Sequence, residues 1–273
     1  ITNGTYTSFA TYTTPSVYGA GVALTADAST AILAVPGKGI FRYTWSTGSN
    51  TYANPVVDSS NVNPAILFNQ IALSQDQQRI VVGDTSGAVY FSNWNGSSFN
   101  QVTKTLDTGA VGGVQIFGPV FSPNKNYIVY GDINLNTWIS YWNGTNYMYP
   151  SKIGTIPGGA SCRGIALSYD GLTLVSQTLS GTGYYSVWNG NGYNSTFTSV
   201  TGSPTGNYWA LFSDISNNFY TTASVPGVAI PIYKYSATYS TGTYSASLCT
   251  FLGANTGTNA SGYYQSTAVG YNA

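Results

Sequence analysis

The sequence predicts an all-β fold, a β-propeller of five full four-stranded blades with a partial closing blade formed from the chain ends. Two patterns that recur in step carry this prediction. One is an apolar residue followed by a hydroxyl residue, at Leu24/Thr25, Leu73/Ser74, Phe121/Ser122, Leu167/Ser168 and Phe212/Ser213. The other is an aromatic residue, at Trp45, Trp94, Trp142, Trp188 and Tyr235. Both recur every 45 to 49 residues, which is the repeat length of a propeller blade.

The composition favours strands over helices. Only 6% of the 273 residues are charged, against about 25% in a typical soluble domain. Tyr (24) and Gly (32) are abundant, all eight acidic residues are Asp, and there is one Met. Glu and Met favour helices, whereas Tyr and Thr suit the pleated surface of a sheet. The composition therefore indicates an all-β protein independently of the repeats.

Each repeat is expected to form four strands. The first ends at the apolar–hydroxyl pair, and a polar turn with Asp or Asn follows. The second is an apolar run, at 31–35, 80–82, 127–130, 172–176 and 219–223. The third leads to the Trp, after which Asn-Gly supplies the positive φ angles of a tight hairpin, at Asn95-Gly96, Asn143-Gly144 and Asn189-Gly190. The fourth strand follows that hairpin.

The whole chain, 1–273, is predicted to be one propeller domain. Its blades span approximately 15–60, 65–108, 112–155, 160–202 and 206–250. Terminal strands at 1–14 and 258–273 resemble only a fourth strand and a first strand of the repeat. Either they close a reduced sixth blade in their own ring, or one of them pairs with a neighbouring subunit, because an unpaired strand edge is a template for another chain. The second alternative produces a filament.

The repeat pattern resembles that of FG-GAP-like and WD-repeat-like extracellular β-propellers. It reads apolar-Ser-x-Asp, then a strand like Ile-Val-Val-Gly, then Val-Tyr-x-x-x-Trp-Asn-Gly-Ser, and it covers about 15–250. The segment from Phe117-Gly118 to Ser122 lies closest to the Phe-Gly element of that group. The resemblance implies a propeller in a surface protein. Because the Asp-x-Asp-x-Asp-Gly calcium loops of the integrin type are missing, no metal site is expected.

Five Asn-x-Ser/Thr sequons are candidate glycosylation sites, at Asn3, Asn95, Asn143, Asn194 and Asn259. Such sequons also arise by chance in a chain rich in Asn, Ser and Thr. Three of them, Asn3, Asn95 and Asn143, share one position in the repeat, the turn after the Trp. We therefore expect these three to project from one rim of the molecule, where an attached glycan would face solvent.

Two cysteines, Cys162 and Cys249, lie in different repeats. A disulfide between them is one prediction for an extracellular chain, and a pair of buried free thiols is the other. Four aromatic residues stand outside the Trp series and are candidate ligand-binding residues, with packing within the sheets as the alternative: Trp138, Tyr208, Trp209 and Tyr263.

Catalysis is not expected, and no catalytic residue or cofactor is assigned. The chain has no His and no Glu, so acid–base chemistry would fall to Asp, Tyr, Lys or Cys. The Asp residues recur at repeat turns, as Asp27, Asp76 and Asp170 do, which indicates a structural role. The eight basic residues are scattered singly and form no stripe for nucleic acid.

The sequence thus predicts a non-enzymatic extracellular or cell-surface protein with a structural or adhesive role, the subunit of a fibre or coat whose partners are copies of itself. The alternative is a carbohydrate-binding propeller lectin whose partners are surface glycans. No apolar run of about 18 residues is present to span a membrane. The chain begins at Ile1, which fits a processed mature chain or a piece of a longer protein.

Overall fold

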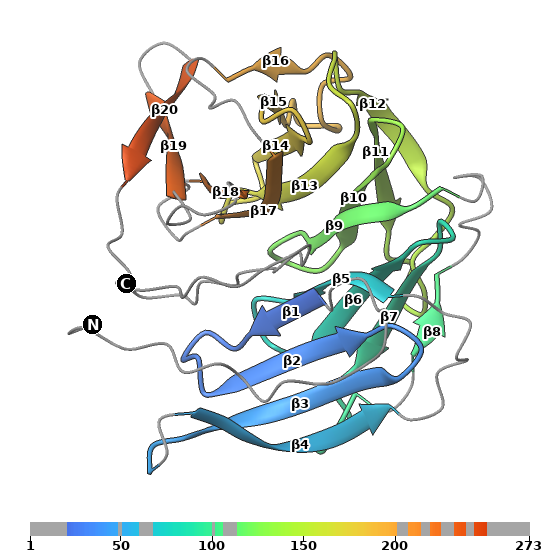
Figure 1. Ribbon diagram of the computed structural model, residues 1–273. Coiled ribbons are helices and arrows are strands. Elements are labelled where there is room, and N and C mark those ends of the chain that lie inside the picture. Colours follow the sequence, from blue (N-terminus) through green and yellow to red (C-terminus); the bar gives the residue numbers. More distant parts are fainter. Residues whose placement is uncertain are drawn as a thin grey trace.

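Five four-stranded antiparallel sheets follow one another along the chain in the computed structural model (Figure 1). The structure describes residues 21–48, 51–59, 68–99, 102–105 and 114–200, and the backbone of strands at 207–213, 219–224, 232–238 and 243–249. No helix occurs in this part of the chain. The all-β prediction is therefore confirmed, while the terminal strands predicted at 1–14 and 258–273 lie outside the described residues.

Within each sheet the strands pair in chain order, so each sheet is an antiparallel meander. The first sheet contains β1 (Gly21–Leu24), β2 (Thr30–Val35), β3 (Gly39–Ser46) and β4 (Thr51–Ser59). The second contains β5 (Phe68–Leu73), β6 (Arg79–Asp84), β7 (Val89–Asn93) and β8 (Thr103–Lys104). The third contains β9 (Ile116–Phe121), β10 (Tyr127–Asp132), β11 (Asn136–Tyr141) and β12 (Ser151–Thr155). The fourth contains β13 (Cys162–Leu167), β14 (Thr173–Thr178), β15 (Gly183–Val187) and β16 (Thr198–Ser199). The fifth contains β17 (Asn207–Ser213), β18 (Phe219–Ser224), β19 (Ile232–Thr238) and β20 (Thr243–Cys249).

Successive sheets are joined through their first strands. β1 contacts β5, β5 contacts β9, β9 contacts β13, and β13 contacts β17. The second strand of each sheet also contacts the first strand of the next. Figure 1 shows the result as an arc, with the first strands on its inner side and the fourth strands on its outer side.

The core lies in the layers between neighbouring sheets. In β6, Ile80 and Val82 pack into a cluster with the first sheet, whereas Val81 packs into a cluster with the third. Successive side chains of a strand point to opposite faces, so a strand between two sheets buries both of them. This explains why the second strands are continuous apolar runs rather than alternating ones.

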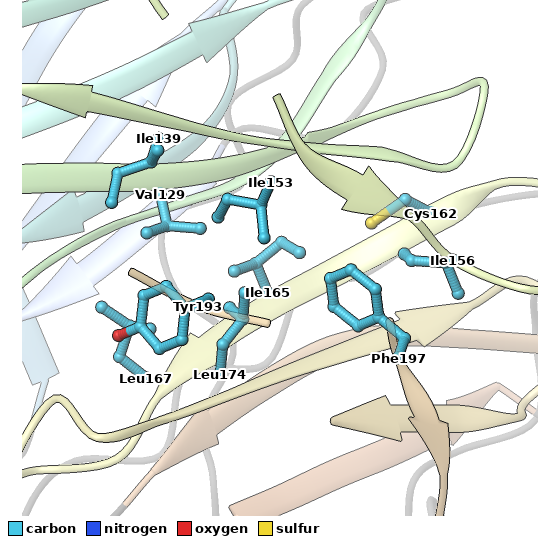
Figure 2. Packing of buried hydrophobic residues seen from close by; sticks show 10 residues of the cluster. All are labelled: Val129, Ile139, Ile153, Ile156, Cys162, Ile165, Leu167, Leu174, Tyr193 and Phe197. Atoms are coloured by element: carbon cyan, nitrogen blue, oxygen red, sulfur yellow. The ribbon is translucent and has the colours of Figure 1, made fainter. Parts of the chain in front are cut away.

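The layer between the third and fourth sheets contains ten buried residues (Figure 2). Each fully buried aliphatic or aromatic side chain contributes about 1.5–3 kcal/mol relative to an exposed one. Gly131 of β10 makes the close approach of the two sheets possible. A Cβ at this position would collide with the sulfur of Cys162 on β13, so any larger residue would force the sheets apart.

The first strand of each of the first four sheets ends in the same turn. In the second sheet, the Ser74 hydroxyl donates to Asp76 Oδ1 at 2.7 Å and accepts from the Arg79 N–H at 2.9 Å, while the Gln78 N–H donates to Asp76 Oδ1 at 3.2 Å. Thr25/Asp27, Ser122/Asn124 and Ser168/Asp170 form the equivalent bonds. The next residue has a positive φ in all four turns: Ala28 (54°), Gln77 (60°), Lys125 (61°) and Gly171 (74°).

The first sheet has a second apolar cluster on the face turned away from the second sheet. Ala31, Val35, Phe41 and Tyr43 are buried there. The outer edge of the same face is less buried: Val57, which pairs with Phe41, is 49% exposed. The face is therefore covered over its inner strands and open at its outer edge.

Candidate functional site

The contacts between successive sheets form the most regular polar and aromatic sites of the molecule. In the second, third and fourth sheets, the Trp at the end of the third strand lies against a side chain of the preceding sheet, and we call this contact a joint. The three joints are Arg42–Trp94 with the guanidinium carbon 4.8 Å from the ring centroid, Arg79–Trp142 at 3.8 Å, and Tyr127–Trp188 with stacked rings 5.6 Å apart. The recurring Trp residues are therefore packing residues of the joints, as expected for the aromatic landmark.

A six-residue hairpin completes each joint. It begins at the Trp and ends at an aromatic residue that is buried against it, in 94–99, 142–147 and 188–193. In the second joint, Tyr147 is fully buried, accepts a hydrogen bond from Arg79 Nη1 at 3.0 Å and donates one to the Lys125 carbonyl at 3.1 Å. Burial raises the pKa of the Tyr147 phenol, so it stays protonated and keeps its donor.

The Asn of this hairpin holds the turn with its side-chain oxygen. Asn143 Oδ1 accepts from the N–H groups of Thr145 and Asn146 at 2.9 and 2.8 Å. Asn95 and Asn189 accept the equivalent pairs of bonds. The turn uses only the oxygen. The amide nitrogen, which is the atom that N-glycosylation modifies, contacts the Met148 sulfur in Asn143 and donates to Asn194 Oδ1 at 3.2 Å in Asn189.

Three of the predicted glycosylation sites lie in the described part of the chain. Asn95 and Asn143 are exposed at equivalent hairpins of the second and third sheets, and Asn194 is exposed just after the hairpin of the fourth. Asn143 Nδ2 lies 2.9 Å from the Met148 sulfur, a weak contact. Asn3 and Asn259 lie outside the described residues. The geometry thus leaves Asn95 and Asn143 accessible from the same rim.

Two buried carboxylates hold the loops between second and third strands. Asp132 accepts from the N–H groups of Asn134 and Asn136 at 2.8 and 3.0 Å and from Trp138 Nε1 at 2.9 Å. Asp84 accepts from the N–H groups of Ser86 and Ala88 in the same way. Both carboxylates are 1% exposed, so their lone pairs are used by the loop that they cap.

Trp138 lies in β11 and donates a hydrogen bond from Nε1 to Asp132, the carboxylate that holds this loop. It lies six residues after Asp132, as Tyr90 lies six after Asp84, and Tyr90 also hydrogen-bonds its Asp. The ring of Trp138 packs against the cluster between the second and third sheets. These contacts favour packing over ligand binding for Trp138. The spacing from Asp is the sequence signal that would have shown this equivalence.

Tyr208 and Trp209, two further candidate ligand residues, lie at an irregularity of β17. The pairing of β17 with β18 shifts between Tyr208 and Ala210. The first strands β5 and β13 carry the same shift, between Phe68 and Gln70 and between Cys162 and Gly164. Bulges re-aim side chains and are common beside binding sites. Tyr263 lies outside the described residues.

Where the other first strands bulge, one side chain ties three sheets together. Gln70 of β5 accepts a hydrogen bond from the Gly118 N–H of β9 and donates to the Arg163 carbonyl of β13 at 3.3 Å. Gly118 has a φ of 55°, and a Cβ there would collide with the backbone of Ile165. The Arg163 guanidinium lies over Phe117, 4.8 Å from the ring centroid. The inner side of the arc is therefore packed with the protein's own polar groups at this level.

Cys162 carries a free, fully buried thiol in the layer shown in Figure 2. Burial raises its pKa to about 12, which leaves it protonated and unreactive. Cys249 ends β20, the outer strand of the fifth sheet, and its side chain lies outside the described residues. A bridge between the two stays a prediction, against which the enclosed free thiol of Cys162 argues.

The described part of the chain contains neither a cluster of metal-ligating side chains nor a long apolar helix. No group of three or more His, Cys, Asp or Glu side chains there could hold a metal ion. No helix in those residues is long and apolar enough to cross a membrane.

Comparison with known proteins gives no family for this chain. No protein-family model matches the sequence, and no curated protein matches it significantly. The likeness of its repeats to FG-GAP-like and WD-repeat-like propellers therefore stays a prediction, and function has to be argued from the joints, turns and exposed faces of this molecule.

Proposed function

We propose that the chain is a β-propeller with a structural or adhesive role outside the cell, the subunit of a surface fibre or coat rather than an enzyme. One observation carries the proposal. The recurring carboxylates are used to hold turns and loops, as Asp76 and Asp132 illustrate, and the recurring Trp residues are used to join sheets. In the described residues, these carboxylates and indole rings are therefore engaged in contacts that hold the fold together.

Five meandering sheets with their first strands on the inner side of an arc are arranged as propeller blades are (Figure 1). The proposed closure of the ring is a reduced blade built from the strands predicted at 1–14 and 258–273. Burial of Ala31, Phe41 and Tyr43 on the far face of the first sheet supports closure within one molecule, because those side chains are enclosed in a single chain. Pairing of a terminal strand with a neighbouring subunit is the competing arrangement.

The proposal of an extracellular location is supported by the low charge content and by the exposed hairpin turns at Asn95 and Asn143. With 6% charged residues, the surface depends on hydroxyl and amide groups for its solubility. Asn95 and Asn143 are exposed, and each holds an equivalent turn through its side-chain oxygen. Glycans on this rim would add to the hydration of a surface that is poor in charge.

The fibre hypothesis is tested with the purified full chain over a wide concentration range, by sedimentation velocity and negative-stain electron microscopy. We expect elongated polymers that grow with concentration. A chain that remains monomeric throughout contradicts the proposal. A variant lacking 1–14 separates the two closures: it lowers the melting temperature of the monomer if the strand belongs to its own ring, and abolishes polymers at an unchanged melting temperature if it belongs to a neighbour's.

Glycan binding is the second candidate, and the irregularity of β17 favours it. Tyr208 and Trp209 occupy this break in the strand pairing, a position at which a strand can present a side chain to a ligand. A glycan array probed with the full chain tests it. Binding that is lost in Trp209→Ala and kept in Tyr149→Ala, a change at a residue 62% exposed elsewhere, supports a lectin. An array without signal contradicts it.

A further inference from the structure

Tyr141 ends β11 and presents an exposed ring on the side of the third sheet that faces the fourth. It is 41% exposed, whereas the next residue, Trp142, turns to Arg79 of the second sheet. The ring of Tyr141 lies edge-on to that of Tyr127 at 5.8 Å, and Tyr127 is itself stacked on Trp188. The Tyr141 ring is therefore held in place by neighbouring aromatic side chains, while part of its surface stays open to solvent.

Met148 places Asn143 beside this ring. The Met148 N–H donates to the Tyr141 carbonyl at 2.8 Å, so these two residues lie opposite each other across the hairpin and share one of its faces. The Met148 sulfur lies 2.9 Å from Asn143 Nδ2. The amide nitrogen of the sequon is therefore next to an apolar surface formed by Tyr141 and Met148, and we call those two residues the platform.

The amide nitrogen of Asn143 can carry a sugar without leaving this position. An amide nitrogen has two hydrogens. N-glycosylation replaces one of them, and the contact with Met148 needs only the other. Asn143 Oδ1 stays with the turn, where it accepts from the N–H groups of Thr145 and Asn146. Because the amide is fixed at both its oxygen and its nitrogen, a sugar attached to Nδ2 leaves the hairpin at the platform.

The equivalent positions of the neighbouring sheets lack this combination. Two residues before Asn95 stands Asn93, which is polar and accepts a hydrogen bond within its own sheet. Two residues before Asn189 stands Val187, which is 40% exposed, but Asn189 belongs to no sequon. Among the hairpins that the structure describes, an exposed aromatic ring and the Asn of a sequon therefore coincide only at Asn143.

We propose that the first sugar of a glycan on Asn143 packs against the platform and stabilises the third sheet, and this inference rests on the proposed location outside the cell. The occupant is an N-acetylhexosamine, whose polarised C–H groups are attracted to the negative face of an aromatic ring. Attachment forms a bond from the anomeric carbon to Nδ2, breaks the bond from that carbon to the phosphate of an activated lipid-linked donor, and releases one Nδ2 proton. A glycan on Asn95 has no such platform.

The first test compares melting temperatures of chains from a secreting eukaryotic host. Asn143→Asp, which removes this glycan, should lower the melting temperature by about 2–4 °C, whereas Asn95→Asp should change it by less than about 1 °C. Asn143→Asp in chain produced without glycosylation should also change it by less than about 1 °C, which separates the sugar from the turn.

Variants of the platform test the contact itself by a double-mutant cycle. Tyr141→Ala also loses its packing against Tyr127, so only the difference made by the glycan is compared. That difference, measured by adding Asn143→Asp, should vanish in Tyr141→Ala and persist in Tyr141→Phe, which keeps the ring.

A further measurement uses the wild type and does not depend on any variant folding. An endoglycosidase that leaves the first sugar on each Asn should not change the melting temperature. Chain made without glycosylation should melt about 2–4 °C lower. A loss that is already complete after the endoglycosidase means that the outer sugars act, and overturns the platform.

The outcomes separate this inference from the proposed function. A glycan on Asn143 that adds no stability, or adds as much in Tyr141→Ala as in the wild type, overturns the platform and leaves the extracellular proposal standing. Equal shifts from Asn95→Asp and Asn143→Asp overturn it in the same way. An unglycosylated Asn143 in the secreted wild type overturns the inference together with the support that the rim gives to an extracellular location.

Discussion

Arg79 of the second sheet lies over the ring of Trp142 of the third, with its guanidinium carbon 3.8 Å from the ring centroid. It donates to Asn93 Oδ1 at 2.6 Å and to the Tyr147 hydroxyl at 3.0 Å. The pairing combines a cation over an aromatic face with directed hydrogen bonds. Arg79 therefore joins the second and third sheets and stabilises the contact between them.

Arg79→Ala should lower the free energy of unfolding by about 2–3 kcal/mol, because both the aromatic contact and the hydrogen bonds are lost. Arg79→Lys keeps the charge but not the planar stack, and should lose about half as much. Urea unfolding followed by circular dichroism measures both. Lys152→Ala, an exposed change on β12, serves as control and should change stability by less than about 0.5 kcal/mol. Equal stability of Arg79→Ala and wild type would contradict the role of this joint.

Gln77→Gly should stabilise the protein. Gln77 has a φ of 60°, and the equivalent residue of the fourth sheet is already a glycine, Gly171. Relief of the left-handed conformation is worth about 1–2 kcal/mol, and the entropy that a glycine costs takes back about 0.5–1 kcal/mol. A rise of about 1–2 °C in melting temperature is therefore expected. Gln78→Gly, one residue later and without a positive φ, should lower it. The opposite order of the two variants would show that the turn is not strained.

Acid should destabilise the protein through Asp27. The Ser29 N–H and the Thr25 hydroxyl lower the pKa of this carboxyl from 3.8 to about 2. A carboxyl with a lower pKa in the folded chain stabilises it fully above the unfolded value, and this stabilisation is lost as the pH falls through the folded value. The melting temperature should therefore fall between about pH 4 and pH 2, and fall less in Asp27→Asn. Parallel curves for the two proteins would rule out this contribution.

Thiol chemistry decides between the bridge and the free cysteines. In Cys249→Ser, Cys162 should not react with Ellman's reagent in the folded protein, because the thiol is buried and its pKa is raised to about 12. It should react on unfolding in guanidinium. The wild type, unfolded without reductant, should then release colour equivalent to both cysteines. No reaction from the unfolded wild type would establish the disulfide.

Asn143→Asp should remove a glycan without disturbing the turn. Its carboxylate still accepts from Thr145 and Asn146, as the amide oxygen does, but the nitrogen that carries the sugar is gone. In a secreting eukaryotic host, intact mass should fall by one glycan relative to wild type. Asn189→Asp changes the same turn where there is no sequon, and its intact mass should differ from the wild type only by the replacement of the amide by a carboxyl group. A mass unaffected by glycosidase in the wild type would refute modification.

The local features of the fold could be predicted from the sequence, because the groups that make them are close in the chain. Ser74 donates a hydrogen bond to Asp76 two residues later, and Asn143 accepts one from the N–H of Thr145 two residues later. Residue type and sequence spacing are therefore enough to predict these turns. The joints could not be predicted in this way, because Arg79 and Trp142 come from different repeats and meet only when the sheets stack. Trp138 stands outside the recurring Trp series, yet its spacing from Asp132 marks it as a repeat position, the one that Tyr90 holds after Asp84.

Gln70 has a consequence for how such a chain can change. In an array whose units contact only their immediate neighbours, a unit can be gained or lost while the others keep their surroundings. Here the second sheet reaches past Gly118 of the third to the Arg163 carbonyl of the fourth. Inserting or deleting one repeat in this region would leave Gln70 facing the wrong backbone, so duplication or loss of a unit there would have to be accompanied by a new residue at this position.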